Sequence, residues 1–121
     1  YWIGEEQHLR AALNKFYFFK DNILKRLKSL SGGEKVRLKL FCLMQKDINF
    51  LILDEPTNHI DIETKEILET ALQEYKGTLL FISHDRYFIN TLATRLVYIE
   101  DNKLKTIPGN YEDYKRFKNK N

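Results

Sequence analysis

The chain has 121 residues, of which 43% are hydrophobic and 13% aromatic, which is enough for one compact domain and too apolar for a disordered chain. No apolar run approaches the ~20 residues of a membrane-spanning helix, and residues 1–10 do not resemble a signal peptide, so we expect no membrane contact and a cytoplasmic location. The single cysteine, Cys42, excludes an internal disulfide and a cysteine-rich metal site; its apolar surroundings predict a small, buried side chain.

The net charge of +3 is unevenly distributed along the chain. Residues 1–46 carry ten Lys/Arg against four Asp/Glu, whereas residues 47–100 carry four against ten. A basic segment of this kind either faces an RNA backbone or forms the solvated side of helices. Charge alone favours the solvated helices.

Residues 5–46 are predicted to be helical, because apolar residues recur there at the spacing of a helix face. The three stripes are Leu9, Leu13, Phe16 and Tyr17; Ile23, Leu24 and Leu27; and Val36, Leu40, Leu43 and Met44. Ser31–Gly33 interrupts this region and restarts a helix.

From Asn49 the pattern changes to strands that alternate with helices, so the predicted fold class is α/β. Two short apolar runs, residues 50–53 and 79–82, are typical of parallel strands that are buried on both faces. The helical spacing of Ile67 to Tyr75 predicts a crossover helix, which Gly77 would terminate.

The remainder of the chain predicts three further elements. We expect a helix from the N-cap Asp85 to about Ala93, then a hairpin of Arg95–Glu100 and Lys103–Ile107 around Asp101-Asn102. A turn at residues 108–110 leads to a closing helix, Tyr111–Lys118.

Polar side chains follow both predicted parallel strands. Asp54 and Glu55 come after the first strand and His84 after the second, so all three should lie at one edge of the sheet. There, one carboxylate can hold Mg²⁺ or its water shell, the next can orient or deprotonate a water, and the histidine can bind a phosphate. An Asp-Glu pair after a strand is often only a polar cap, and a single histidine is more often structural, but their convergence favours a site.

Ser31 and Glu34 have the spacing of a capping box at a helix start. Gly32 and Gly33 are not needed for capping, and each costs ~1 kcal/mol of helix stability relative to alanine. What the glycines add is accessible backbone N–H groups at a helix N-terminus, which is a surface that binds anions. The segment therefore predicts contact with a phosphate.

Together these segments resemble the ABC-type ATPases, and the resemblance covers essentially the whole chain. Leu30–Glu34 resembles the ABC signature, Phe50–Glu55 the Walker B strand, and Asn58–Asp61 the D-loop, while His84 resembles the switch histidine. Glu34 and the segments at 54–59, 83–88 and 108–114 are similar to the soluble F subfamily, whose members carry two nucleotide domains, lack a membrane domain and act on ribosomes.

The resemblance implies a helical signature subdomain at about 1–46 and, at about 47–121, part of a P-loop-type ATPase core with a C-terminal hairpin and helix. It implies the cofactors ATP and Mg²⁺, with Glu55 and His84 as catalytic residues and Asp54 as a magnesium ligand, through water. Nucleotide contacts would come from Ser31, Gly32, Gly33 and Glu34, in trans to a second nucleotide-binding domain of the parent chain, and from the D-loop residues Asn58, His59 and Asp61. The other implied partner is the ribosome or its RNA.

No G-x-x-x-x-G-K-[ST] loop can be drawn, so the sequence lacks the backbone cradle and the lysine that hold β- and γ-phosphates. With Tyr1 as its first residue, the chain is expected to be the C-terminal half of one nucleotide domain, inactive alone and prone to self-association. Two alternatives stay open: the ATPase subunit of a membrane transporter, and a non-catalytic ribosome- or RNA-binding module.

Overall fold

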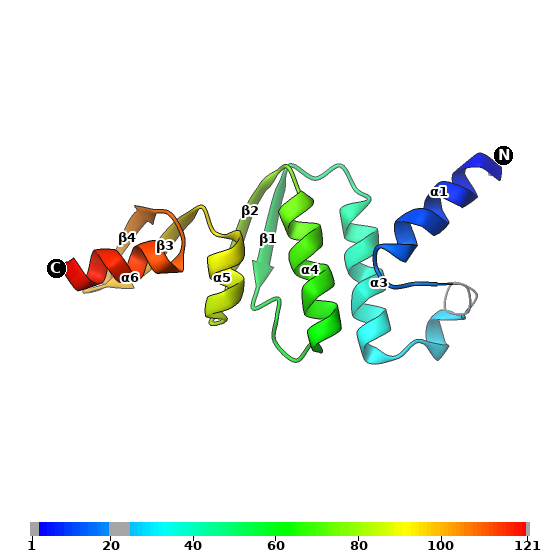
Figure 1. The fold of residues 1–121 in the computed structure, drawn as a ribbon, viewed down its shortest axis with the longest axis horizontal. Coiled ribbons are helices and arrows are strands. Elements are labelled where there is room, and N and C mark those ends of the chain that lie inside the picture. The colour runs from blue at the N-terminus through cyan, green and yellow to red at the C-terminus, as the bar shows by residue number, and fades with distance from the viewer. Residues whose placement is uncertain (1–2, 20–24, 121) are drawn as a thin grey trace. The chain divides into compact units, whose positions relative to one another are not determined.

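A computed structural model describes residues 3–19 and 25–120 and shows an α/β chain (Figure 1). The elements in order are α1 (Ile3–Asn14), the 3-10 turn η1 (Leu27–Ser29), α3 (Gly32–Met44), β1 (Phe50–Asp54), α4 (Ile62–Glu74), β2 (Thr78–Ile82), α5 (Arg86–Leu92), β3 (Arg95–Glu100), β4 (Lys103–Pro108) and α6 (Tyr111–Lys120).

The chain divides into two compact units, which are described separately. The helical unit comprises the described residues up to Asn49 together with His59–Gly77, and the strand unit comprises Phe50–Asn58 and the residues from Thr78 onward.

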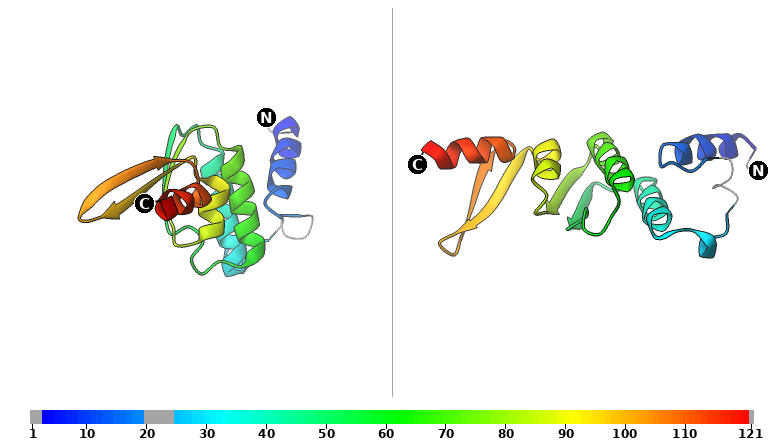
Figure 2. Two further views of the ribbon diagram at one scale, coloured as in Figure 1. Left: turned by 60° about the vertical axis from the view of Figure 1, so that its left-hand side comes forward. Right: turned by 60° about the horizontal axis from the view of Figure 1, so that its bottom comes forward.

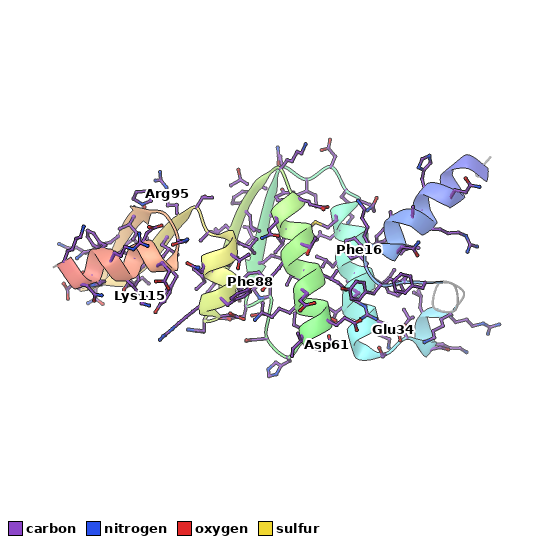
Figure 3. The ribbon with its side chains drawn as sticks, in the orientation of Figure 1. Phe16, Glu34, Asp61, Phe88, Arg95 and Lys115 are labelled. Atoms are coloured by element: carbon purple, nitrogen blue, oxygen red, sulfur yellow. The ribbon has the colours of Figure 1, made fainter. Side chains whose placement is uncertain are left out.

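In the helical unit, α3 and α4 run side by side in the same direction and begin at the same end (Figures 1 and 2). Glu34, in the first turn of α3, and Asp61, directly before α4, mark this common end in Figure 3. The ring of Phe16 packs edge-on against that of Phe41, with centroids 5.4 Å apart, and both rings are buried. The unit therefore presents two helix N-termini at one edge.

Burial on the helices differs from the predicted stripes. Helix α3 buries Glu34, Arg37, Leu40 and Phe41, whereas Val36 is exposed. The prediction that Cys42 is buried is wrong: Cys42 is exposed, because it lies about 100° around the helix from the buried Phe41.

The N-terminal stripes also need correction. Helix α1 ends at Asn14, so Tyr17 lies beyond it in the left-handed conformation with φ of 62°, and Leu9 on the helix is exposed. Leu27 is exposed in the short turn η1. Ile23 and Leu24 lie outside the described residues.

The predicted termination of the crossover helix at Gly77 is also wrong. Helix α4 ends at Glu74, and its C-cap, Tyr75, is extended, with its hydroxyl donating to the Ile48 carbonyl at 2.7 Å. A Cβ added at Gly77 would overlap the Tyr75 ring and lie 2.8 Å from the Asn49 carbonyl oxygen. Gly77 therefore serves a close approach of chain segments rather than a left-handed helix cap.

In the strand unit, β1 and β2 pair in parallel, from Phe50 opposite Thr78 to Asp54 opposite Ile82, as predicted. Strands β3 and β4 form the predicted hairpin, with Arg95 opposite Pro108 and Glu100 opposite Lys103. Its turn residues, Asp101 and Asn102, both have positive φ (52° and 58°), as a two-residue type I′ turn requires.

The predicted helices of this unit are confirmed. The Asp85 side chain accepts a hydrogen bond of 3.0 Å from the N–H of Phe88 and so caps α5. Phe88 is fully buried and packs edge-on against Phe81 with ring centroids 5.1 Å apart. Helix α6 follows Gly109, whose φ is +108°.

The prediction that β1 and β2 are buried on both faces is wrong. One face exposes a set of apolar side chains, each 48% to 62% exposed, namely Phe50, Ile52, Leu80 and Ile82. Leu51, on the other face, is buried. We call this set the apolar sheet face; the described part of the chain does not cover it, which explains why an all-apolar run shows alternating burial here.

Candidate active site

Glu55 directly follows β1, and its backbone is fixed on both sides. Its N–H donates to the Ile82 carbonyl at 2.8 Å, which extends the parallel ladder by one residue, and its carbonyl accepts from the N–H of Asn58 at 3.1 Å. Its φ of 46° is left-handed, a conformation that is uncommon for a residue other than glycine. The carboxylate is 21% exposed, so it lies near the surface without being fully solvated.

His84 lies beside Glu55, as the parallel topology predicted. The Nε2 nitrogen is 3.3 Å from the Oε1 oxygen of Glu55, and the backbone N–H of His84 donates to Oε2 at 3.4 Å. The imidazole itself is 96% exposed. An exposed histidine held at a carboxylate can contact a ligand that approaches the sheet edge.

Asp54 is the last residue of β1 and is exposed, so its carboxylate is accessible to a metal ion. Within the described residues no three His, Cys, Asp or Glu side chains gather as a ready metal site. Mg²⁺ is commonly held by one or two carboxylates together with water and phosphate oxygens, and Asp54 fits this mode of binding.

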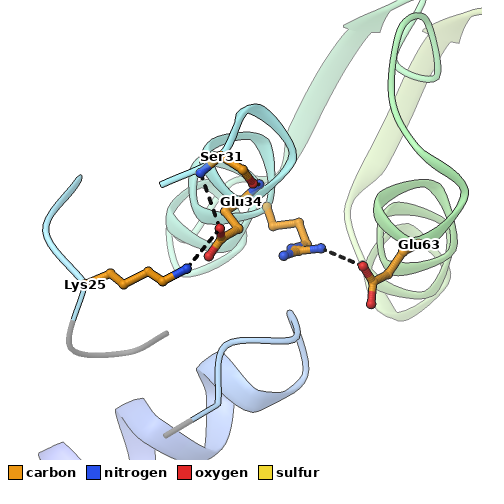
Figure 4. Close-up of polar contacts among 5 residues, drawn as sticks. Lys25, Ser31, Glu34 and Glu63 are labelled. Atoms are coloured by element: carbon orange, nitrogen blue, oxygen red, sulfur yellow. Dashed lines mark hydrogen bonds and ion pairs between the residues drawn. The ribbon is translucent and has the colours of Figure 1, made fainter. Parts of the chain in front are cut away.

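The start of α3 forms the predicted capping box (Figure 4). The Ser31 hydroxyl accepts from the N–H of Glu34 at 3.1 Å, and the N–H of Ser31 donates to the Glu34 carboxylate at 3.3 Å. The N–H groups of Gly32 and Gly33 lie in the first turn and have no partner within the helix. A Cβ added at Gly32 would meet nothing within 4 Å, so there is open space beside this residue, and the N-terminal turn of a helix is a place where anions bind.

Glu34 is buried yet ionised more readily than an ordinary glutamate. Its hydrogen bond from the Ser31 backbone lowers the pKa of the carboxyl, assisted by the Ser31 hydroxyl and by Lys25, whose Nζ lies 3.4 Å away. Burial acts in the opposite direction, and the hydrogen bonds outweigh it.

The three D-loop residues are distributed over the two units. Asn58 ends the first segment of the strand unit, whereas His59 and Asp61 belong to the helical unit. His59 is exposed with φ of 59°, and Asp61 is the N-cap of α4. The pKa of Asp61 is lowered, chiefly by the nearby Thr64 side chain, although the Asp61 carboxylate accepts no capping hydrogen bond from the backbone of α4.

The helical unit gathers six of the predicted nucleotide-binding residues around one cleft of about 810 Å³. They are Ser31, Gly32, Gly33, Glu34, His59 and Asp61. The two helix N-termini at this edge make the cleft suitable for an anion. Glu55, His84 and Asp54 form a separate group in the strand unit.

Arg37 and Glu63 line the same cleft and were missed by the sequence analysis. The Arg37 side chain is only 8% exposed, and its Nη1 donates to Glu63 Oε2 at 3.1 Å. Arg37 is three residues after Glu34 and three before Leu40, a spacing that places it on the buried helix face. Because residues 1–46 carry ten Lys/Arg, Arg37 was counted with the solvated charges and its place on the buried helix face was overlooked.

Comparisons with known proteins agree with the motifs. The family model described as "ABC transporter" matches residues 4–58. YdiF of Bacillus subtilis is 53% identical over 109 residues, which is 90% of this chain and 17% of YdiF. ABC transporter F family member 2 of Arabidopsis thaliana is 45% identical over 85% of this chain and 15% of its own length.

EttA of Haemophilus influenzae, the energy-dependent translational throttle protein, is 43% identical over 92% of this chain and 20% of its own length. Among solved structures, RNase-L Inhibitor superposes with a TM-score of 0.62 at 24% identity, covering 90% of this chain and 23% of that one, which supports the α/β fold. This chain thus spans about a fifth or less of these proteins. Among the described residues, no helix is both long enough and apolar enough to cross a membrane. Motifs, fold and relatives agree: the chain is similar to the ABC-type ATPases, and its relatives are in the F group of that family.

Proposed function

We propose that the protein containing this chain hydrolyses ATP and that this chain supplies the acid–base and signature residues of the reaction. The contact of 3.3 Å between His84 and Glu55 is the observation that carries the proposal. It joins the ends of two parallel strands, the place where α/β proteins bind ligands.

In this proposal the carboxylate of Glu55 accepts a hydrogen bond from the attacking water and orients it, or takes its proton at an Oε oxygen. His84 holds the same carboxylate through its backbone N–H and presents its exposed imidazole toward the phosphate. ATP would supply the phosphoryl group, and Mg²⁺ would offset its negative charge. Asp54 would hold the metal, through water.

The residues around the cleft of the helical unit serve a different contact. The backbone N–H groups of Gly32 and Gly33, with Ser31, would bind the phosphates of ATP held by a second nucleotide-binding domain of the same protein, and the space beside Gly32 is open. Glu34 fixes this turn through the capping box. Asn58, His59 and Asp61 would form the loop that contacts the opposite domain.

The name of EttA, an energy-dependent translational throttle protein, supports a role in translation. We infer from this role that the partner is the ribosome and the location the cytoplasm. The test is phosphate release by the full-length protein with and without ribosomes. We expect ribosomes to stimulate turnover. Turnover that does not respond to ribosomes would contradict the translational role, and no turnover at all would contradict the ATPase assignment.

We further propose that residues 1–121 alone bind ATP weakly or not at all, because the sequence has no phosphate-binding loop. Calorimetric titration of this chain with Mg-ATP measures the affinity directly. An affinity in the micromolar range would show that the missing loop is not the main source of phosphate contacts.

A further inference from the structure

Arg37 occupies an unusual environment for a charged side chain. It is buried within the helical unit, and its guanidinium carbon lies 5.8 Å from the centre of the Phe18 ring. Its Nη1 donates to Glu63, whose carboxylate is labelled in Figure 4, while its Nε has no partner within the described residues.

Stability alone does not explain an arginine here. Removing a guanidinium from water costs several kcal/mol, and only good pairing and complete hydrogen bonding return that cost. Glu63 is 55% exposed, so water screens its attraction for Arg37, and Nε is left unsatisfied. An apolar side chain of similar length would fill the same space at less cost. What the arginine adds is a directed link between two helices.

The link joins the two segments that carry the proposed nucleotide contacts. Arg37 lies one turn after Gly33 on α3, and Glu63 is the second residue of α4, the helix that begins directly after the D-loop. The same two helix starts also touch at Gly33, where an added Cβ would lie 3.4 Å from Asp61 Oδ1 and 3.5 Å from Thr64 Oγ1. The charge of Arg37 also reaches Asp61, where it contributes to the lowered pKa.

We propose that Arg37, through Glu63, is a positioning residue that holds the Gly32-Gly33 turn and the His59–Asp61 segment in one fixed relation. The proposal rests on the proposed ATPase function. Arg37 does not touch nucleotide; it sets the spacing between two segments that must meet the opposite domain together. Loss of the link therefore lowers the rate of reaction in the closed state, and it leaves the initial binding of ATP unchanged.

The test uses the full-length ATPase with Arg37→Met, Glu63→Gln and the double variant. We expect kcat to fall about tenfold to a hundredfold for Arg37→Met, because small displacements of reacting groups have effects of this size. KM for ATP should stay within about twofold, since a displaced segment that acts only after binding changes kcat without changing capture. The double variant should be no slower than Arg37→Met, because both changes remove one interaction.

Arg37→Lys keeps the charge and should recover part of the lost kcat, which an effect of packing alone would not produce. Leu40→Ala is the matched control: it removes buried volume one turn further along α3 and should lower the melting temperature while kcat stays near that of the unaltered protein. An unchanged kcat in Arg37→Met would overturn the proposal, and so would losses in the double variant that equal the product of the two single losses. It would also be overturned if kcat fell together with the melting temperature in Leu40→Ala. An unaltered protein without turnover would instead contradict the proposed function itself.

Discussion

Both carboxylate oxygens of Glu55 face His84, two residues after the end of β2: Oε1 lies 3.3 Å from Nε2 of His84, and Oε2 accepts a hydrogen bond of 3.4 Å from the backbone N–H of His84. The orientation of this carboxylate is thus set by the neighbouring strand as well as by its own. The left-handed φ of Glu55 turns the chain at this point, a strained geometry that is common where a side chain must be held for function.

Glu55→Gln in the full-length protein should lower kcat by at least about a hundredfold, because the amide cannot take a proton from water. ATP binding should persist, since the size and most hydrogen bonds of the side chain remain, and an ATP-bound state should accumulate. Phosphate release and nucleotide binding, measured side by side, check this. Glu112→Gln, an exposed carboxylate on α6, is the control. Normal hydrolysis by Glu55→Gln would assign the catalytic role to another residue.

His84→Ala should have a smaller effect than Glu55→Gln. The alanine variant keeps the backbone N–H contact to Glu55 and loses only the imidazole, so we expect a decrease in kcat of about tenfold to a hundredfold, equivalent to one hydrogen bond to a charged group. Steady-state kinetics with His8→Ala, an exposed histidine of α1, as control would measure it. A loss of ATP affinity at unchanged kcat would make His84 a binding residue rather than a catalytic one.

The capping carboxylate predicts a pH dependence of stability. The pKa of Glu34 in the folded chain lies below its ordinary value of 4.5, so ionised Glu34 stabilises the fold above about pH 4.5, and this contribution is lost as the pH falls through the lowered folded pKa. Denaturant unfolding between neutral pH and pH 3 should therefore show a shallower loss of stability on acidification in Glu34→Gln. Glu66→Gln, an exposed carboxylate on α4, serves as control. Equal slopes in Glu34→Gln and the unaltered chain would contradict the assignment.

The apolar sheet face predicts that residues 1–121 self-associate when they are isolated. Exposed apolar patches and unpaired strand edges both promote contacts between chains. Light scattering over a concentration series should show a rising mean mass, and Ile52→Thr with Leu80→Thr should reduce it. Ile62→Thr, a change at an exposed residue outside this face, is the comparison. A strictly monomeric chain that unfolds cooperatively would mean that the exposed face does not drive association.

The sequence predicted the elements of the strand unit well, because each prediction depended on local chemistry. Asp85 caps α5, the Asp101-Asn102 pair forms the hairpin turn, and the parallel register brings His84 to Glu55. These outcomes follow from short-range backbone preferences and from topology, both of which are readable in one sequence.

Burial was predicted less well, because it depends on what packs against an element. A continuous apolar run indicates a strand but does not say whether both of its faces are covered, and Ile52 is exposed. Arg37 shows the opposite error: a basic residue on a helix is usually solvated, yet this one is buried between α3 and α4. Whether Arg37 is buried and paired with Glu63 depends on how the two helices pack, and this packing cannot be read from a single sequence.

The two pairings of the strand unit close chain loops of very different length. The β3–β4 hairpin turns through two residues, whereas Glu55 and His84 are 29 positions apart and meet only after the chain has passed through α4. Short loops close faster and lose less entropy, so we expect the hairpin to form early and the site to assemble late during folding. Pulsed hydrogen exchange should protect the amides of β3 and β4 before that of Glu55; the reverse order would contradict this sequence of events. A newly made chain would then hold a finished hairpin while its carboxylate and histidine are still apart.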